Sequence, residues 1–250
     1  MPATIRMAAN KSTVDEIRRR FDGETDRYTN LETGQLSAVD AVLAMNLVAE
    51  AAAATTPHAT NLLDVGCGGG NYTLKLLERL PHLDVTLIDL SQAMLDLAVP
   101  RIRPRSTGSV TAIQADIRDI NLGKSRFDIV LASAVLHHLR ADNEWRSVLQ
   151  KVHDALKPRG SFWIFDIVES PLPEVQTIHW RRYGEYLTAA GGESFRKELY
   201  ERIIEEDTPR SVPYQLDLLR AVGFSEVELL HKNSCYAALG AVKKNIEGRA

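Results

Sequence analysis

The sequence predicts an α/β fold, in which helices cover both faces of one doubly wound, mostly parallel sheet. Between residues 57 and 170, short apolar runs alternate with segments of helical periodicity. A glycine-rich loop, residues 66–70, directly follows the first of these runs. Strand, helix and strand in this rhythm indicate parallel pairing with right-handed crossovers.

Bulk composition excludes several classes of protein. The 250 residues carry a net charge of −3, which argues against a nucleic-acid groove built on bulk positive charge. No apolar run approaches the roughly 20 residues of a membrane span, and the first residues contain no apolar signal segment. Cys67 and Cys235 lie far apart and are expected to be thiols in a reducing cytoplasm.

The first 56 residues are predicted to form helices that cover the active site. Ser12, with Asp15 three positions later, has the pattern of a helix start. The three arginines at 18–20 are expected to lie on a solvated face of this helix. A second helix, rich in alanine and leucine, is expected over residues 37–54.

The core is predicted at residues 57–170 and 210–245. Strands are expected at 62–65, 85–89, 110–115, 127–132 and 161–167. Helices are expected at 72–80, from Ser91 to just before Pro100, at 143–156 and at 213–222, with "KPRG" (157–160) as a break. Residues 227–231 and 236–242 would close the sheet as an antiparallel hairpin, which gives seven strands. The charged, helical residues 171–209 interrupt the pattern and are predicted to be an inserted lid.

The glycine loop marks the expected ligand site of such a sheet, because ligands bind outside the carboxyl ends of parallel strands. Glycine lets the backbone turn tightly and approach a ligand closely. A dinucleotide site needs G-x-G-x-x-G, but Asn71 stands at the third glycine position. The pattern is instead D-x-G-x-G-x-G, formed by Asp64, Gly66, Gly68 and Gly70. Cys67 within this loop is expected to be a packing residue.

Acidic residues also end the next two predicted strands. Asp89 can accept two hydrogen bonds from the ribose diol of a nucleoside cofactor. Asp116 can accept one from an adenine amino group, with Ile117 packing on the ring. Leu90 and Met94 could cover the other face of that ring. The fourth strand ends in "LASAVLHHL", which places Ser133 and two histidines beside the first loop.

Five motifs occur in order: "LLDVGCGGG", "LIDLSQAML", "QADIRDI", "FDIVLASAVLHHL" and "LKPRGSFWIFD". With them, residues 62–168 resemble the class I S-adenosylmethionine-dependent methyltransferases. The resemblance implies a Rossmann-like methyltransferase fold with S-adenosyl-L-methionine as cofactor. It implies that Asp64, Gly66 and Gly68 hold the methionine part, Asp89 the ribose and Asp116 with Ile117 the adenine. Ser133 would lie at the methionine end.

A narrower resemblance links the chain to carboxy-S-adenosylmethionine synthase and its relatives, which serve tRNA wobble modification. It is carried by "FDGETDRY", "ADIRDI" and the late segment "PYQLDLLRAVGFSEVELLHKNSCYAALGAVK". The arginine that holds the added carboxylate in that family falls at Tyr200 here, with Arg196 and Arg202 nearby. This departure favours a shared architecture over a shared reaction.

The predicted function is methylation of a small molecule by in-line transfer. His137 and His138 are the candidate catalytic bases, with His138 preferred, because histidine can be neutral near pH 7. No third ligand of suitable spacing is visible near them, so no metal is expected. Alternatives are the carboxylated-cofactor chemistry and a cofactor-binding protein without catalysis. Nucleic acid and membrane partners are not expected, and a homodimer is possible.

Overall fold

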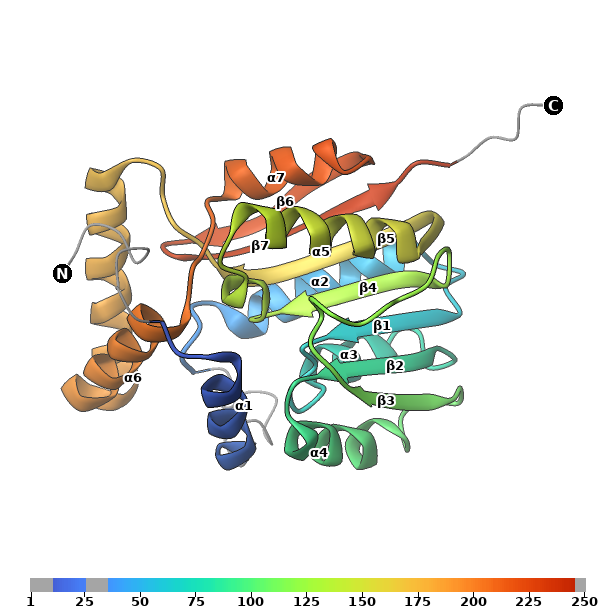
Figure 1. Cartoon of the computed structure of the whole chain (residues 1–250), viewed down its shortest axis with the longest axis horizontal. Coiled ribbons are helices and arrows are strands. Elements are labelled where there is room, and N and C mark those ends of the chain that lie inside the picture. Colours follow the sequence, from blue (N-terminus) through green and yellow to red (C-terminus); the bar gives the residue numbers. More distant parts are fainter. Residues whose placement is uncertain (1–10, 26–35, 246–250) are drawn as a thin grey trace.

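The computed structural model describes residues 11–25 and 36–245. Its centre is one seven-stranded sheet of order β3-β2-β1-β4-β5-β7-β6 (Figure 1). Strands β1 to β5 pair in parallel, while β7 runs antiparallel to both β5 and β6. The strands are β1 (Asn61–Val65), β2 (Asp84–Asp89), β3 (Val110–Gln114), β4 (Phe127–Ser133), β5 (Leu156–Ile167), β6 (Phe224–Asn233) and β7 (Tyr236–Lys243). The predicted doubly wound sheet with a C-terminal hairpin is confirmed.

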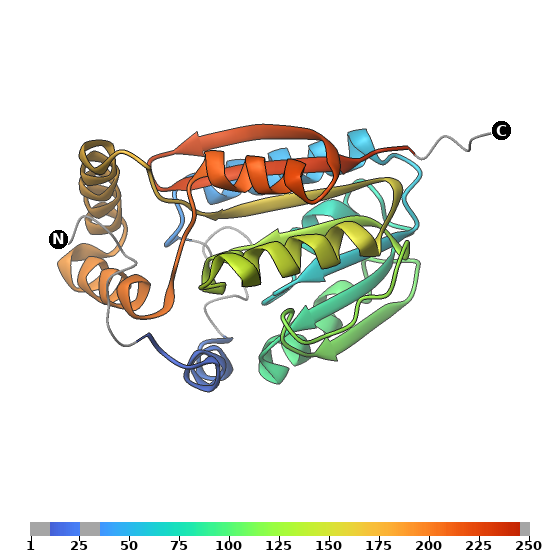
Figure 2. The ribbon, with the colours of Figure 1, turned by 45° about the horizontal axis from the view of Figure 1, so that its top comes forward.

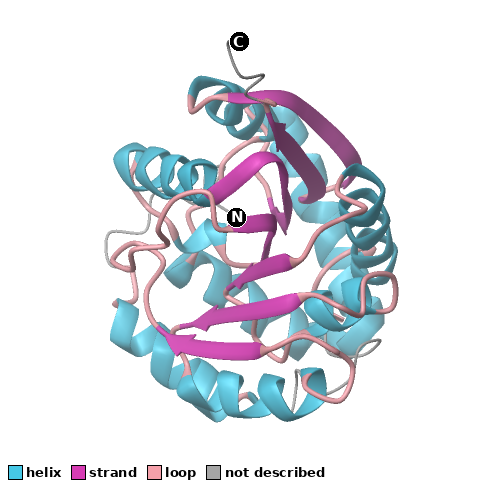
Figure 3. Cartoon of the chain, turned by 90° about the vertical axis from the view of Figure 1, so that its right-hand side faces the viewer, coloured by secondary structure: helices cyan, strands magenta, loops and turns pink. Residues whose placement is uncertain are grey.

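Helices lie on both faces of the twisted sheet (Figure 3). One apolar core contains residues of α2, α3 and α4, and a second contains residues of α5 and α7. Successive side chains of a strand point to opposite faces of the sheet. In β1, Leu62 therefore belongs to the first core and Leu63 to the second. The helices are α1 (Val14–Gly23), α2 (Ala41–Thr55), α3 (Asn71–Leu77), α4 (Gln92–Ile102), α5 (Asp142–Ala155), α6 (Pro173–Glu206) and α7 (Val212–Ala221), with a short 3₁₀ turn, η3 (Leu136–His138).

Three predicted boundaries are wrong for identifiable reasons. Helix α1 begins one residue later than expected, because Thr13 rather than Ser12 forms the capping box with Glu16. Helix α4 continues through Pro100 to Ile102, whose fully buried side chain packs against the glycine loop. The "KPRG" segment lies inside β5, where the pairing register with β4 shifts.

Helices α1 and α6 stand together beyond the carboxyl ends of the parallel strands (Figures 1 and 2). Helix α6 consists of two helical segments that meet at Gly192, whose φ of 82° and ψ of −179° are not helical. By contrast, α2 packs on the sheet, against β5, β6 and β7. The division of the chain into covering helices, core and lid stays a prediction. Within the described chain, no helix combines the length and the apolarity needed to cross a membrane.

Candidate functional site

A cavity of about 220 Å³ lies at the carboxyl ends of the parallel strands, and residues of α1 and of the end of α6 also line it. Every residue that the sequence assigned to the site lines this one cavity. These residues are Asp64, Gly66, Cys67, Gly68, Asp89, Leu90, Met94, Asp116, Ile117, Ser133, His137 and His138. The fold therefore brings all twelve together, although their individual roles remain predictions.

The glycine loop turns with positive φ at Gly66 (63°), Gly68 (49°) and Gly70 (78°). A Cβ on Gly66 would lie 2.5 Å from Val135, and a Cβ on Gly70 would lie 2.5 Å from Ile102. A Cβ on Gly68 would meet nothing within 4 Å, because it would point into open space. Gly66 and Gly70 are thus required by packing, whereas the room beside Gly68 is available to a ligand.

Asp89 connects the end of β2 to the glycine loop. Its carboxylate accepts a hydrogen bond from the Gly68 N–H at 2.8 Å and another from the Ser91 N–H at 2.9 Å. Burial raises the pKa of Asp89, and the two N–H groups, with that of Leu90, oppose this shift. A carboxylate has about four acceptor positions, so Asp89 can accept further bonds from a ligand.

Asp64 at the end of β1 is buried more completely. Its Oδ2 accepts a hydrogen bond from the Thr73 hydroxyl at 2.6 Å. Burial raises the pKa of Asp64 to about 7, against the opposing effect of the Thr73 hydrogen bond. A cationic group placed in the cavity beside Asp64 would stabilise its ionised form.

Asp116, after β3, holds Arg118 in a two-pronged ion pair, with guanidinium distances between 2.5 and 3.0 Å. Its Oδ1 also accepts the Arg118 N–H at 2.8 Å. The sequence did not indicate this partner, which occupies part of the acceptor capacity expected for adenine. Ile117 and Met94 are buried and apolar, as a surface for a flat ring requires.

Cys67 and Cys235 are both free and buried. Burial, with the nearby charges of Asp89 and Asp64, raises the pKa of the Cys67 thiol well above its usual range. A thiol that stays protonated is a poor nucleophile. Cys67 is therefore not expected to act as a nucleophile, and its place among the predicted cofactor-binding residues stays a prediction.

A buried histidine–aspartate pair lies at the ends of β4 and β5. Asp166 contacts His137 Nδ1 through Oδ1 and accepts the backbone N–H groups of Leu136 and His137, at 2.9 and 3.2 Å, through Oδ2. Burial lowers the pKa of His137, but Asp166 and then Asp207 outweigh it and raise the pKa to about 9. Asp166 fixes the orientation of this ring.

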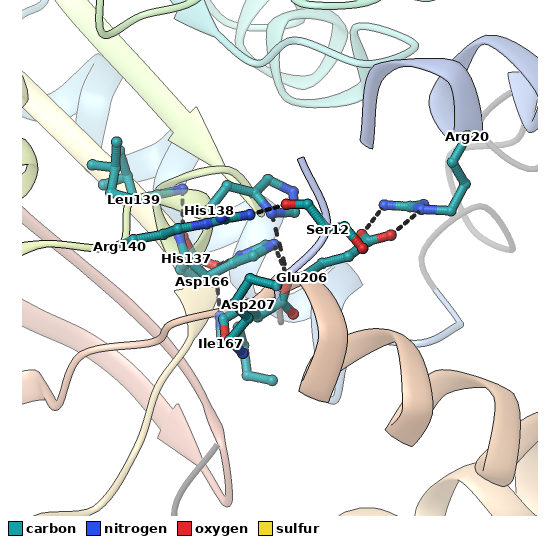
Figure 4. A network of polar contacts seen from close by, with 12 residues as sticks. Ser12, Arg20, His137, His138, Leu139, Arg140, Asp166, Ile167, Glu206 and Asp207 are labelled. Carbon is teal, nitrogen blue, oxygen red and sulfur yellow. Dashed lines mark hydrogen bonds and ion pairs between the residues drawn. The ribbon is translucent and has the colours of Figure 1, made fainter. Parts of the chain in front are cut away.

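Asp207, directly after α6, faces both histidines (Figure 4). Its Oδ1 lies 3.5 Å from His137 Nε2 and 3.5 Å from His138 Nδ1. Neither ring nitrogen of His138 makes a hydrogen bond of good geometry to the described chain, although the Glu206 backbone influences its pKa. Burial, followed by the charge of His137, lowers the pKa of His138 well below its usual range.

Two ion pairs join α1 to α6 above the cavity. Arg20 binds Glu206 through Nε, at 2.6 Å from Oε1, and through the terminal Nη2, and Arg202 binds Glu24 at 2.8 Å. The expectation of a solvated arginine face is wrong for Arg20, whose side chain is only 20% exposed and lines the cavity.

Sequence analysis missed Asp166, Asp207 and the Arg20–Glu206 pair. Asp166 ends "SFWIFD", and the signal that identified Asp64 and Asp89, an acid at a strand end, applies to it as well. No local pattern distinguishes Asp207 from the acids before it, because only the fold brings α6 over the histidines.

Residues 62–160 match a family whose model is described as "Methyltransferase domain". The match falls on the residues whose motifs resemble methyltransferases, and it supports that resemblance. It covers less than half of the chain, and its bounds enclose the glycine loop, β2 to β4 and both histidines.

Among curated proteins, the chain is 29% identical over 92 residues to a malonyl-[acyl-carrier protein] O-methyltransferase of a Paenibacillus species, covering 36% of this chain and 33% of that protein. It is 23% identical over 186 residues to the carboxy-S-adenosyl-L-methionine synthase of Nautilia profundicola, covering 73% and 76% of the two chains. The chain spans between one third and one half of the first curated relatives that it matches.

A similar solved structure is the 1,6-didemethyltoxoflavin-N1-methyltransferase of Burkholderia thailandensis. Its TM-score is 0.60 at 20% identity, covering 96% of this chain and 94% of that one. That protein was crystallised with 1,6-didemethyltoxoflavin and S-adenosylhomocysteine. At this identity the likeness supports the fold and not the substrate.

Proposed function

We propose that the chain is an S-adenosylmethionine-dependent methyltransferase acting on a small molecule. One observation carries this proposal. The acids that end three neighbouring strands, Asp64, Asp89 and Asp116, line the same cavity as the glycine loop. Parallel strands bring these side chains to one edge of the sheet, where a nucleoside with an amino-acid tail meets all three.

The residues present suit that cofactor. The room beside Gly68 accommodates the amino-acid tail, and the buried Asp64 matches its ammonium group. Asp89 offers acceptor positions to the ribose, while Ile117 and Met94 flank the place of the adenine. When bound, the cofactor supplies an electrophilic methyl group, and the chain supplies binding and alignment.

The acceptor would lie on the β4–β5 side of the cavity. There the lining is aromatic and apolar at Phe21, Phe165, Tyr183 and Ile203, and it includes the two histidines. A cavity covered by α1 and α6 suits a small molecule better than a polymer, because the Arg20–Glu206 and Arg202–Glu24 pairs hold the two helices together over it. These covering helices would also exclude water from the reaction.

Calorimetric titration of S-adenosylmethionine into the full chain tests the cofactor assignment. Asp89→Asn should weaken binding, and Asp128→Asn should not, because Asp128 lies at the opposite strand end and pairs with Lys157. A small-molecule extract incubated with protein and cofactor should then yield products larger by one CH₂ group in mass spectrometry. Binding without any such product would favour a cofactor-binding protein; no binding would refute the proposal.

A second candidate is chemistry like that of carboxy-S-adenosylmethionine synthase. Arg202 lies two residues from the position where the resemblance places the carboxylate-holding arginine, and it lines the cavity. Tyr200 itself is engaged elsewhere, since its hydroxyl donates to the Trp180 carbonyl at 2.5 Å. Arg202 is paired with Glu24 and Glu198, which lowers its capacity for a further anion. Mass spectrometry of the nucleotide that co-purifies with the protein distinguishes the two candidate functions, because only the synthase-like function predicts a carboxylated cofactor.

A further inference from the structure

We propose that His137, His138 and Asp207 form a site for a divalent transition metal on the acceptor side of the cavity. One nitrogen of each histidine and one carboxylate oxygen of Asp207 lie within 4.8 Å of one another. All three residues line the cavity. The sequence hid this site, because Asp207 is 69 positions from His138 and reaches it only through the fold of α6.

The spacing suits a metal better than a hydrogen-bond network. Asp207 Oδ1 is 3.5 Å from His137 Nε2 and 3.5 Å from His138 Nδ1, too long for good hydrogen bonds. A tetrahedral site with metal–nitrogen bonds of about 2.0–2.1 Å places its ligand atoms about 3.3–3.4 Å apart. The two separations from Asp207 therefore match edges of such a site, and the two histidine nitrogens lie within 4.8 Å of each other.

The surroundings of both histidines support the same inference. Asp166 contacts His137 Nδ1 and leaves Nε2 directed to Asp207, which is the usual arrangement of a metal-binding histidine with a carboxylate behind it. Asp166 is itself held by three backbone N–H groups, those of Leu136, His137 and Ile167. His138 presents solvent-shielded ring nitrogens without a hydrogen bond of good geometry. If the role of His138 were only structural, we would expect its ring nitrogens to be hydrogen-bonded.

The donor set indicates the class of metal. Two imidazoles and one carboxylate suit zinc, iron or another transition metal of intermediate softness, and calcium or magnesium prefer oxygen ligands. One divalent ion would be balanced by the charges of Asp207 and Asp166. Three protein ligands leave a position open to the cavity, as catalytic metal sites do.

The site also narrows the class of acceptor, and this step rests on the proposed function. A metal at this place would bind an acceptor oxygen and lower its pKa. The acceptor would therefore be a small molecule with a metal-binding oxygen at or next to the methylated atom, such as a phenol, an enolisable carbonyl or a carboxylate. His137 and His138 would then act as ligands and not as the bases that the sequence suggested.

The test is a titration of Zn²⁺ and Co²⁺ into the full chain after treatment with a chelator. We expect one equivalent to bind, with Co²⁺ giving the visible absorption of a low-symmetry, histidine-ligated site. His138→Ala and Asp207→Asn should abolish binding and that absorption. Asp166→Asn should lower the affinity by about 10–100-fold through the orientation of His137. His58→Ala, which removes an exposed histidine elsewhere, should change nothing.

The affinity for S-adenosylmethionine is also measured on every metal-free variant. A misfolded variant loses this affinity, whereas a variant that has lost only the metal site keeps it. Variants that bind S-adenosylmethionine normally but no longer bind Co²⁺ support the inference. It is overturned if the wild-type chain binds no stoichiometric metal, or if His138→Ala and Asp207→Asn bind as well as wild type. Failure of the metal-free wild type to bind S-adenosylmethionine would refute the proposed function instead and leave the metal result standing.

Discussion

The open space beside Gly68 allows a sharp test of where the cofactor lies. In Gly68→Ala, the new methyl group would meet no protein atom within 4 Å. It would therefore cause no clash within the protein, and a loss of cofactor affinity would show that the methyl group obstructs the bound cofactor. The φ of 49° imposes a left-handed backbone cost of about 1–2 kcal/mol on alanine. About 0.4–1 kcal/mol of this is offset by the lower entropy of the unfolded chain.

The net loss of stability, near 1 kcal/mol, corresponds to a fall in Tm of about 2–4 °C for a chain of this size. Cofactor binding should suffer more, because a methyl group inserted into a close-fitting contact typically costs about 1–3 kcal/mol. We expect the Kd for S-adenosylmethionine to rise about 5–150-fold by calorimetry.

Gly123→Ala is the matched control. Gly123 also has a positive φ, 75°, and its Cβ would meet only the Arg126 side chain, which is exposed and can move. It lies just before β4, at the end of the sheet away from the cavity. We expect a similar fall in Tm with an unchanged Kd. Equal affinities of the two variants would refute the placement of the cofactor beside Gly68.

Three further outcomes follow from the same site. Asp89→Asn should raise the Kd for the cofactor by about 10–150-fold, since bonds to a charged acceptor are worth about 1.5–3 kcal/mol; calorimetry at constant pH checks this. Gly66→Ala should lower Tm by about 4–8 °C, more than Gly123→Ala, because φ strain is joined by the clash with Val135. Asp64 should make the cofactor-free chain lose stability, relative to an Asp64→Asn chain, as the pH rises from about 4 to about 7. Asp64 has a pKa of about 7 when folded, against an ordinary value of 3.8 in an unfolded chain, so the unfolded chain binds fewer protons in this window. The contribution of Asp64 to the free energy of unfolding falls by about 4 kcal/mol across this window, and the difference between the urea-denaturation profiles of the wild-type chain and Asp64→Asn measures it.

The strand-end acids could be predicted because their signal is local. Asp64 and Asp89 each follow a short apolar run, and parallel strands necessarily bring such positions to one edge. The separation of Leu62 and Leu63 into two cores was not predicted, because both residues are leucines in one short buried run and only the strand geometry places them on opposite faces. Boundaries were harder, because tertiary packing decided them. Pro100 reads as a helix stop, yet burial of Ile102 keeps the helix going for two more residues.

The acceptor side could not be predicted, since it depends on contacts over long sequence separations. Asp207 meets His137 only because the end of α6 returns to the carboxyl end of β4, and Arg20 becomes half-buried only because Glu206 lies beside it. The sequence around each of these residues contains no pattern that distinguishes it from neighbouring charged residues. A pattern search can weigh a residue against its neighbours in sequence, but not against a partner 186 positions away, as Glu206 is from Arg20.

The strand order explains why cofactor and acceptor can be treated separately. The order reverses between β1 and β4, so the chain leaves the sheet in opposite directions on the two sides of that point. The predicted cofactor residues Asp64 and Asp89 lie at the ends of β1 and β2, and Asp116 follows β3. The two histidines follow β4, and Asp166 lies at the end of β5. Helices α1 and α6 contribute cavity residues above the histidines. Helix α1 also reaches the cofactor half, since the Ser91 hydroxyl donates to Asp22 at 2.6 Å. Changes in α6 should therefore alter the choice of acceptor while the cofactor half, built on different strands, keeps its affinity.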